Sequence, residues 1–139
     1  MVDLTDSYLR KIFDQMNRIA ILGASLNSLR AGYYVSTYLH QVRFSIFPVN
    51  PTYLGKSLEN RPFVASLSEI DEPLDTINIF RASHLLLAHL PEILALKPLP
   101  RLAWFQPGSH DPKVTCELYN AGITVIQQRC IFTEHNRLN

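Results

Sequence analysis

The sequence has few cysteines and no pattern that would bind a structural metal. Its two cysteines, Cys116 and Cys130, form no CxxC pair and lack the Cys/His spacing of a zinc site. Two thiols in a chain of this size are typical of a reducing compartment, and the N-terminal residues carry aspartates where a signal peptide would have an apolar core. We therefore expect a cytoplasmic protein without a metal centre.

Long apolar runs and a strong net charge are also absent. The longest apolar run, 85–90, is interrupted by His89 and is far shorter than the roughly 20 residues that a membrane span needs. The formal net charge is +1, which favours neither nucleic acid nor an anionic membrane as a partner. The chain has 139 residues, 47% of them hydrophobic, which predicts one globular domain.

Several catalytic and nucleotide-binding motifs are missing. The chain contains no Walker motif, HExxH or GxSxG, so no catalytic constellation is predicted. A dinucleotide fingerprint needs GxGxxG and an acidic residue about 20 positions later. Here the segment 23–28 has only the first glycine, and Asn50 stands where the acidic residue would be. The sequence therefore disfavours NAD.

The chain does contain an alternation of short apolar strands and amphipathic helices. Strands are predicted over 18–22, 43–49, 76–80, 101–105 and 124–127. Helices are predicted over 5–16, 32–41, 83–97 and 112–121, with a short helical turn at 67–70. Thr5, Ser83 and Asp111 are the expected N-caps, and Pro91 should kink or restart its helix. The residues after 127 read as an irregular tail.

This alternation predicts an α/β fold with a single Rossmann-like, doubly wound domain. Its five-stranded, mostly parallel sheet would have flanking helices and right-handed crossovers. Residues 1–17 would form a covering helix of the same domain, and residues 18–139 the ligand-binding part. Ligands bind such sheets at the carboxyl ends of the strands, so the residues after each strand are the candidates for a site.

The loop 23–28, between the first strand and its helix, is the main candidate for an anion site. Free N–H groups at a helix N-terminus favour an anion. The window 15–58 has no acidic residue and four basic ones, so it carries +4 and the rest of the chain −3. This asymmetry also favours an anionic ligand at the loop. In the alternative interpretation, Ser25, Asn27 and Ser28 only cap the helix.

Residues elsewhere have chemical alternatives that the sequence leaves open. His84 and His89 are five positions apart, which does not stack them on one helical face as a metal pair. A nucleophilic Cys130 would need a stabilised thiolate, and a structural role is the simpler interpretation. Glu134 and His135 are adjacent, so a catalytic dyad is one interpretation. A surface position or an oligomer contact is the one that we favour.

Several short stretches, ordered along the chain, carry a resemblance to a known family. They are Ile21-Leu22-Gly23-Ala24-Ser25, Phe47-Pro48-Val49-Asn50-Pro51, Ile79-Phe80-Arg81, Trp104-Phe105-Gln106-Pro107-Gly108, and Arg129-Cys130-Ile131 with Glu134-His135. Together they resemble the small bacterial and archaeal CoA-binding proteins, which share the fold of the CoA-binding domain of the succinyl-CoA synthetase alpha subunit. The resemblance implies a stand-alone, Rossmann-like module that binds coenzyme A or acyl-CoA. We expect this module to be non-catalytic, and a homo-oligomer is left open.

The strand ends and the resemblance together predict a cofactor-binding site. Its members are Gly23, Ala24, Ser25, Asn27, Ser28, Arg30, Asn50, Pro51, Phe80, Arg81, Gln106 and Gly108. By the resemblance, the pyrophosphate would lie against the first loop and the adenosine part near the second strand. The family usually follows its loop Arg or Lys with Pro-Ser, whereas this chain has Ala31-Gly32 and so loses a rigid helix start and a hydroxyl.

Two other functions stay open at this point. One is an NAD(P)-binding, oxidoreductase-like protein that uses the same cleft. The other is a regulatory or interaction subunit with little ligand binding, in which the apolar run 85–90 and Pro91 form a dimer or partner surface.

Overall fold

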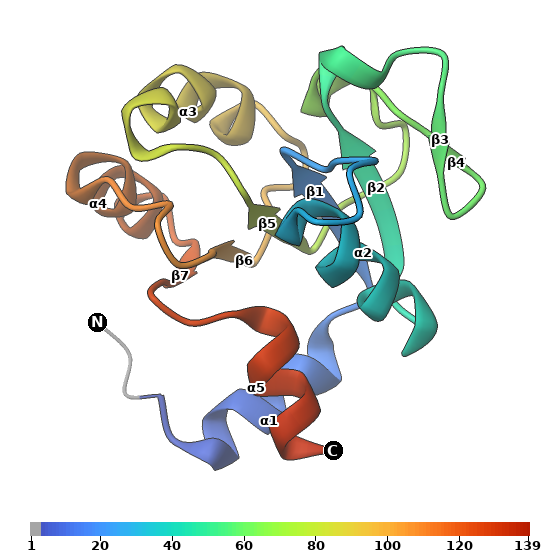
Figure 1. Ribbon diagram of the computed structural model, residues 1–139. Helices are drawn as coiled ribbons and strands as arrows, with labels where there is room; N and C mark the ends of the chain where they lie inside the picture. The colour runs from blue at the N-terminus through green and yellow to red at the C-terminus, as the bar shows by residue number, and fades with distance from the viewer. Residues whose placement is uncertain (1–3) are drawn as a thin grey trace.

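The computed structural model describes residues 4–139, and five parallel strands form its central sheet (Figure 1). The strands are β1 (Arg18–Leu22), β2 (Ser45–Val49), β5 (Thr76–Ile79), β6 (Leu102–Phe105) and β7 (Thr124–Ile126). The helices are α1 (Asp6–Gln15), α2 (Ala31–Gln41), α3 (Leu86–Leu94), α4 (Pro112–Asn120) and α5 (Ile131–Leu138). The shorter elements are η1 (Pro51–Tyr53), β3 (Ser57–Leu58), β4 (Arg61–Pro62), η2 (Leu67–Glu69) and η3 (Ser83–Leu85). The predicted α/β class and doubly wound sheet are confirmed.

The sheet is covered by helices on both faces, as a parallel sheet requires. Alternate residues of β1 point to opposite sides, so Ile19 and Ile21 join one core cluster and Ala20 and Leu22 join the other. The first cluster lies under α1, α2 and α5, and the second under α3 and α4 (Figure 1). Every residue of β5 and β6 is buried, which explains the uninterrupted apolar sequence of β6, whereas β5 also buries the polar residues Thr76 and Asn78.

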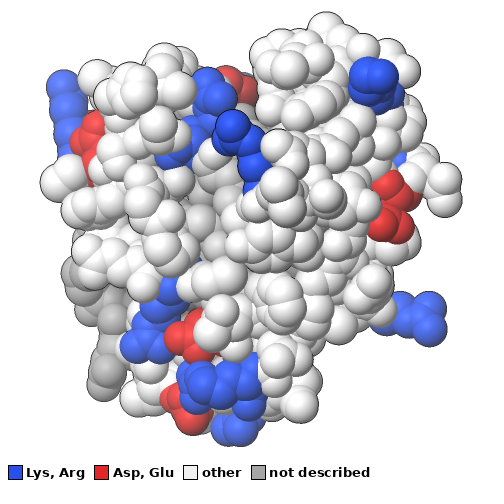
Figure 2. Space-filling model, in the orientation of Figure 1, with Lys and Arg blue, Asp and Glu red and all other residues white. Residues whose placement is uncertain are grey.

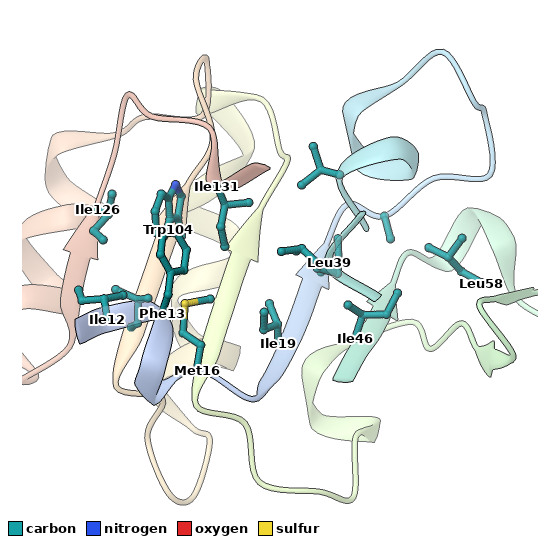
Figure 3. Close-up of a cluster of buried hydrophobic side chains, with 14 of the residues drawn as sticks. Ile12, Phe13, Met16, Ile19, Leu39, Ile46, Leu58, Trp104, Ile126 and Ile131 are labelled. Carbon is teal, nitrogen blue, oxygen red and sulfur yellow. The ribbon is translucent and has the colours of Figure 1, made fainter. Parts of the chain in front are cut away.

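Trp104 is the largest side chain of the first cluster and joins the sheet to the two terminal helices. Its ring stacks on Phe13 of α1 with 5.6 Å between centroids. Its indole N–H donates to the carbonyl of Arg129 at 2.8 Å, just before α5. Figure 3 shows Trp104 packed among Phe13, Ile126 and Ile131. Segments from both ends of the chain therefore pack on the same indole.

The strand order β2-β1-β5-β6-β7 creates a defined crevice. The chain moves from β1 to β2 on one side and then crosses back to β5 on the other, so consecutive connections leave β1 in opposite directions. In doubly wound sheets such a reversal separates the loops at the carboxyl ends of the two strands, and ligands bind there. The fold thus directs attention to the loops after β1 and β5.

The predicted irregular tail is wrong, because residues 131–138 form α5. Ile131, His135 and Leu138 are spaced four and three positions apart and pack on the first core cluster. Glu134 and His135 are both buried, so the surface position favoured for them is also wrong. Glu134 bonds Arg129 at 2.6 Å and Arg137 at 2.9 Å, which compensates for the burial of its charge.

The helix predicted over 83–97 is shorter and begins differently. Ser83 does not cap it: its hydroxyl donates to the carbonyl of Gly108 and accepts from the backbone N–H of His110, both at 3.0 Å. The helix α3 is continuous through Pro91, so the predicted restart is wrong. Pro91 and Leu87 are both exposed, and water can therefore solvate the carbonyl of Leu87 that the proline leaves without a donor.

The remaining predictions of local structure are confirmed with small shifts. Thr5 accepts from the N–H of Tyr8, and Asp111 caps α4 by accepting from Lys113. The strand predicted from position 43 begins at Ser45, because Arg43 has a φ of 83° and forms the turn before β2. The small antiparallel pair β3–β4 has no counterpart in the prediction, since each of its strands has only two residues.

Candidate cofactor-binding site

A cavity of about 290 Å³ lies at the carboxyl ends of β1, β5 and β6, where the strand order reverses. Its lining residues are Gly23, Ser25, Arg30, Ala31, Gly32, Phe80, Arg81, Ala82, Gln106, Pro107, Gly108 and Ser109. They come from the loops that follow three different strands and from the start of α2. Seven of the twelve predicted site residues are among them.

Two glycines allow the backbone segments of this site to approach closely. Gly23 has a φ of 91°, and a Cβ there would lie 2.7 Å from the carbonyl oxygen of Phe80. A Cβ on Gly32 would lie 2.7 Å from the carbonyl oxygen of Gly23. No side chain fits in either place without a backbone shift. Gly32, which looked like a loss in the sequence, is therefore what lets the N-terminus of α2 pack on the loop.

The N-terminus of α2 is left without a side-chain cap. Its N-cap residue is Arg30, which makes no capping hydrogen bond. The N–H groups of Ala31 and Gly32 have no acceptor among residues 4–139, and both residues line the cavity. These are orphan donors at the positive end of a helix dipole. They favour an anion in the cavity.

The serine and asparagine of the loop stabilise the loop itself, so the interpretation that they cap α2 is wrong. The N–H of Asn27 donates to Oγ of Ser25 at 2.9 Å, and the N–H of Leu29 donates to Oδ1 of Asn27 at 3.0 Å. Both are short turns closed by a side chain. The loop is thus held in shape without using the N–H groups at the start of α2.

The residues that follow β2 support the loop through hydrogen bonds. Asn50 donates from Nδ2 to the carbonyl of Ala24 at 2.9 Å and accepts the N–H of Thr52 at 3.0 Å. The hydroxyl of Tyr53 lies 3.2 Å from Oγ of Ser25. Five predicted site residues therefore lie around the cavity without lining it: Ala24, Asn27, Ser28, Asn50 and Pro51.

The charges at the cavity are basic. Arg30 and Arg81 line it, and none of its lining residues is acidic. Figure 2 shows basic side chains gathered between α3 and the loop after β1. Of the four basic residues in the acid-free window, only Arg30 lines this cavity. Arg18 instead lies 3.6 Å from Glu72, at the amino end of β1, so the charge asymmetry of the sequence reflects the site only in part.

Comparison with known proteins identifies the family. The model of the CoA binding domain matches residues 17–136. The chain belongs to this family. It is 33% identical over 127 residues to the uncharacterized protein YneT of Bacillus subtilis, with 91% of each chain covered.

Solved structures show the same fold. The structure of cell-free ID.343 from Thermus thermophilus is similar with a TM-score of 0.93 and 40% identity, over 98% of this chain and all of that one. The acetyl-coenzyme A synthetase 1 of Ca. Korarchaeum cryptofilum is similar at 20% identity and a TM-score of 0.67. The likeness covers 84% of this chain and 26% of that one, and it shows the fold alone.

In this member of the CoA binding domain family, α5 orients one polar side chain of the cavity. The N–H of Ile131, the first residue of α5, donates to Oε1 of Gln106 at 3.0 Å. Because the amide oxygen is used in this way, the Nε2 group of Gln106 is the end left for the cavity. Nε2 has no partner among the described residues, and it can only donate.

The cavity has hydrogen-bond donors and lacks the groups of acid–base catalysis. Its lining includes no His, Cys, Asp or Glu. The Ser109 hydroxyl donates to the carbonyl of Arg81 at 2.6 Å, and Oγ of Ser25 already accepts from Asn27. Within residues 4–139 no group of three or more His, Cys, Asp and Glu side chains could hold a metal ion, and no helix could cross a membrane.

A larger cavity lies elsewhere in the molecule, but it has no arginine and no uncapped helix start in its lining. It measures about 660 Å³ and follows the outer edge of β7 beside α4. Its lining has no Lys, Arg, Asp or Glu, and it includes Tyr119 and Ile123. It is larger, but the smaller cavity lies where the strand order reverses and has the orphan donors and both arginines. We therefore place the candidate site in the smaller one.

Proposed function

We propose that this protein is a non-catalytic module that binds coenzyme A or acyl-CoA. The phosphates lie in the cavity, against the 23–28 loop and the start of α2. The adenosine part extends toward the end of β2, beside Asn50 and Pro51. Arg30, Arg81 and Nε2 of Gln106 supply the remaining charge and donors.

The observation that carries this proposal is the uncapped N-terminus of α2. Helix ends in folded proteins usually have their first N–H groups satisfied by a cap, water or ligand. Here the loop makes its own hydrogen bonds and leaves the N–H groups of Ala31 and Gly32 facing a cavity with two arginines. Membership in the CoA binding domain family supports coenzyme A as the anion.

An NAD(P)-binding function has less support. The ribose hydroxyls of NAD are usually bound by a carboxylate after the second strand. Asn50 holds that place, and both ends of its amide are already bonded to the backbone. The lining of the cavity also offers no acid–base group for a redox substrate.

Calorimetric titration with coenzyme A, dephospho-CoA and NAD tests the proposal. Both ligands carry a pyrophosphate, but we expect coenzyme A to bind more tightly than NAD. Coenzyme A adds a 3′-phosphate charge, and Asn50 replaces the carboxylate that would bind the ribose hydroxyls of NAD. The affinity for dephospho-CoA shows whether the 3′-phosphate of coenzyme A contributes to binding. Tighter binding of NAD would reject the proposal in favour of the oxidoreductase-like alternative. Absence of heat with all three ligands would favour an interaction subunit.

A further inference from the structure

A chain of hydrogen bonds holds Arg81 from the side of α3. Nε of Arg81 donates to Nε2 of His89 at 3.2 Å, and Nδ1 of His89 lies 2.8 Å from Oε2 of Glu92. Oε1 of Glu92 accepts the backbone N–H of Leu67, in η2, at 2.8 Å. We call these three side chains the Arg81–His89–Glu92 network. It links the cavity to α3 and η2, which do not line the cavity.

The donors and acceptors of this network determine the tautomer of His89. An arginine can only donate, so Nε2 of His89 must be the acceptor and must carry no proton. The proton of the neutral ring is then on Nδ1, where Glu92 accepts it. This requires Glu92 to be ionised.

Glu92 is held in its ionised form by its surroundings. Burial by itself would raise the pKa of Glu92. The hydrogen bonds from His89 and from the Leu67 amide, with the nearby charge of Arg81, outweigh the burial and keep that pKa below its ordinary value. The Glu92 carboxylate thus fixes the tautomer of His89 through Nδ1, the ring nitrogen that does not contact Arg81. Carboxylates orient the histidine ligands of metals in the same way.

The result is a defined place for the Arg81 side chain. Its Cδ lies 3.2 Å from the point where a Cβ of Gly23 would be, so the side chain crosses the loop at that glycine. Because Nε is bonded to His89, the terminal nitrogens Nη1 and Nη2 are the donors left over. Within residues 4–139 neither has a protein partner. A free arginine loses rotamer entropy when it binds, and one already held loses less.

We propose that His89 and Glu92 are positioning residues that hold Arg81 so that its two terminal nitrogens bind the phosphates of the ligand end-on. This inference rests on the proposed binding of coenzyme A. The competing interpretation is that His89 and Glu92 only fasten α3 to η2 and leave the affinity of the site unaffected.

Five variants, four single and one double, separate the two interpretations by calorimetry with coenzyme A. His89→Leu removes the acceptor for Nε of Arg81, and His89→Gln supplies an amide oxygen in its place. His84→Leu is the matched control, because His84 is exposed in η3 and makes no side-chain hydrogen bond within the described residues. The fourth variant, Arg81→Ala, is made alone and together with His89→Leu to complete a double-mutant cycle.

We expect His89→Leu to weaken coenzyme A binding about 10-fold, as loss of an orienting outer group does elsewhere. His89→Gln should recover most of that affinity, and His84→Leu should bind like the wild type. His89→Leu should cause no further loss once Arg81 is absent. The inference is overturned if His89→Leu binds coenzyme A as tightly as His84→Leu does. It is also overturned if the affinity lost in His89→Leu adds fully to the affinity lost in Arg81→Ala. If His89→Leu does not fold, Glu92→Gln takes its place in the cycle.

A ligand-free measurement keeps this inference separate from the proposed function. The ¹⁵N chemical shifts of the His89 ring in the wild type should show a protonated Nδ1 and an unprotonated Nε2 at neutral pH. The opposite tautomer would overturn the positioning role whether or not coenzyme A binds. If the wild type binds no coenzyme A, the proposed function fails, and inorganic pyrophosphate replaces coenzyme A in the same cycle.

Discussion

At the scale of single residues, Gly23 is the position where the site tolerates least change. Gly23 and Gly55 both have positive φ, 91° and 85°, so an alanine is strained at either. Only at Gly23 does the new Cβ also meet a backbone oxygen, at 2.7 Å, whereas nothing lies within 4 Å at Gly55. We expect Gly55→Ala to lower the free energy of unfolding by about 1 kcal/mol. Gly23→Ala should lower it by about 3 kcal/mol, because overpacking adds to the strain.

Urea denaturation of the two variants measures this difference in the free energy of unfolding. Because both positions share the backbone strain of a positive φ, the difference reports the contact of the new Cβ with the carbonyl oxygen of Phe80. Equal losses of stability would mean that β1 and β5 do not need to approach at Gly23. Gly23→Ala should also weaken coenzyme A binding, since the loop moves, whereas Gly55→Ala should leave it unchanged.

Arg30 is the residue whose removal should distinguish phosphate from nucleoside binding. It lines the cavity beside the uncapped start of α2, and its side chain is exposed and caps nothing. Arg30→Ala should weaken coenzyme A binding about 10-fold, the cost of one charge-assisted hydrogen bond, and leave adenosine binding nearly unchanged. Calorimetry with both ligands checks this, with Arg10→Ala in α1 as the control. Equal losses for coenzyme A and adenosine would remove Arg30 from the phosphate site.

The sequence identified those lining residues of the cavity that directly follow a strand. It identified only some of the others. Gly23, Arg81 and Gln106 line the cavity, as expected of residues that come just after a predicted strand. Asn50 also follows a strand, but its amide turns back to the loop. The partners of Arg81 on α3 were missed, because the three-residue spacing of His89 and Glu92 gives no sign of which side chain they meet.

At the scale of elements, α5 is the helix that the sequence analysis missed, and its role is mainly structural. The run from Ile131 has its apolar positions interrupted by Glu134 and His135, which look like surface residues. Both are buried because tertiary partners satisfy them: arginines for Glu134, and the Tyr38 hydroxyl, 2.7 Å from Nδ1, for His135. A single sequence does not show such partners. The same helix also orients Gln106, so the site depends on it.

The packing of α5 should make stability depend on pH near neutrality. Burial lowers the pKa of His135 below its ordinary value, and burial raises that of Tyr38, so the tyrosine donates to a neutral imidazole. The unfolded chain therefore binds a proton at His135 more readily than the folded chain. Its stabilising contribution is complete above the unfolded pKa of about 6.5 and is lost as pH falls through the lower folded value.

Urea denaturation at pH 7.5 and at pH 5.5 measures this loss. Carboxylates titrate mostly below this range, so the fall in the free energy of unfolding should be smaller in His135→Gln than in the wild type. His135→Gln should also be less stable at pH 7.5 by at least about 1 kcal/mol, the value of a buried hydrogen bond. His84→Gln serves as the control, because His84 is exposed and has no side-chain hydrogen bond within the described residues. An identical pH dependence in wild type and His135→Gln would contradict the assignment.

At the scale of the whole molecule, the fold followed from the sequence more completely than the site did. A buried parallel strand such as β6 has no exposed face, so its apolar run is unambiguous, and Gly and Pro mark most of the boundaries. The strand order, which creates the crevice beside β1, depends on crossovers that local patterns do not encode. The cavity beside β7 is larger than the candidate site but lacks its orphan donors and arginines, so size alone does not mark a site.

The whole chain should therefore become more stable when the crevice is filled, because the ligand contacts loops from three strands and the start of α2 together. A ligand that binds only the folded state raises the free energy of unfolding by about 2.7 kcal/mol at 100 times its Kd. For a domain of this size that corresponds to a rise in Tm of about 8 °C. Thermal denaturation with coenzyme A should show this rise, and NAD at the same concentration should show much less. Arg81→Ala should reduce the shift with coenzyme A and lower the ligand-free Tm only slightly, because the variant loses the hydrogen bond from Nε to His89 while the terminal nitrogens bond nothing else in residues 4–139. An equal shift with NAD would contradict both the choice of ligand and the placement of its phosphates.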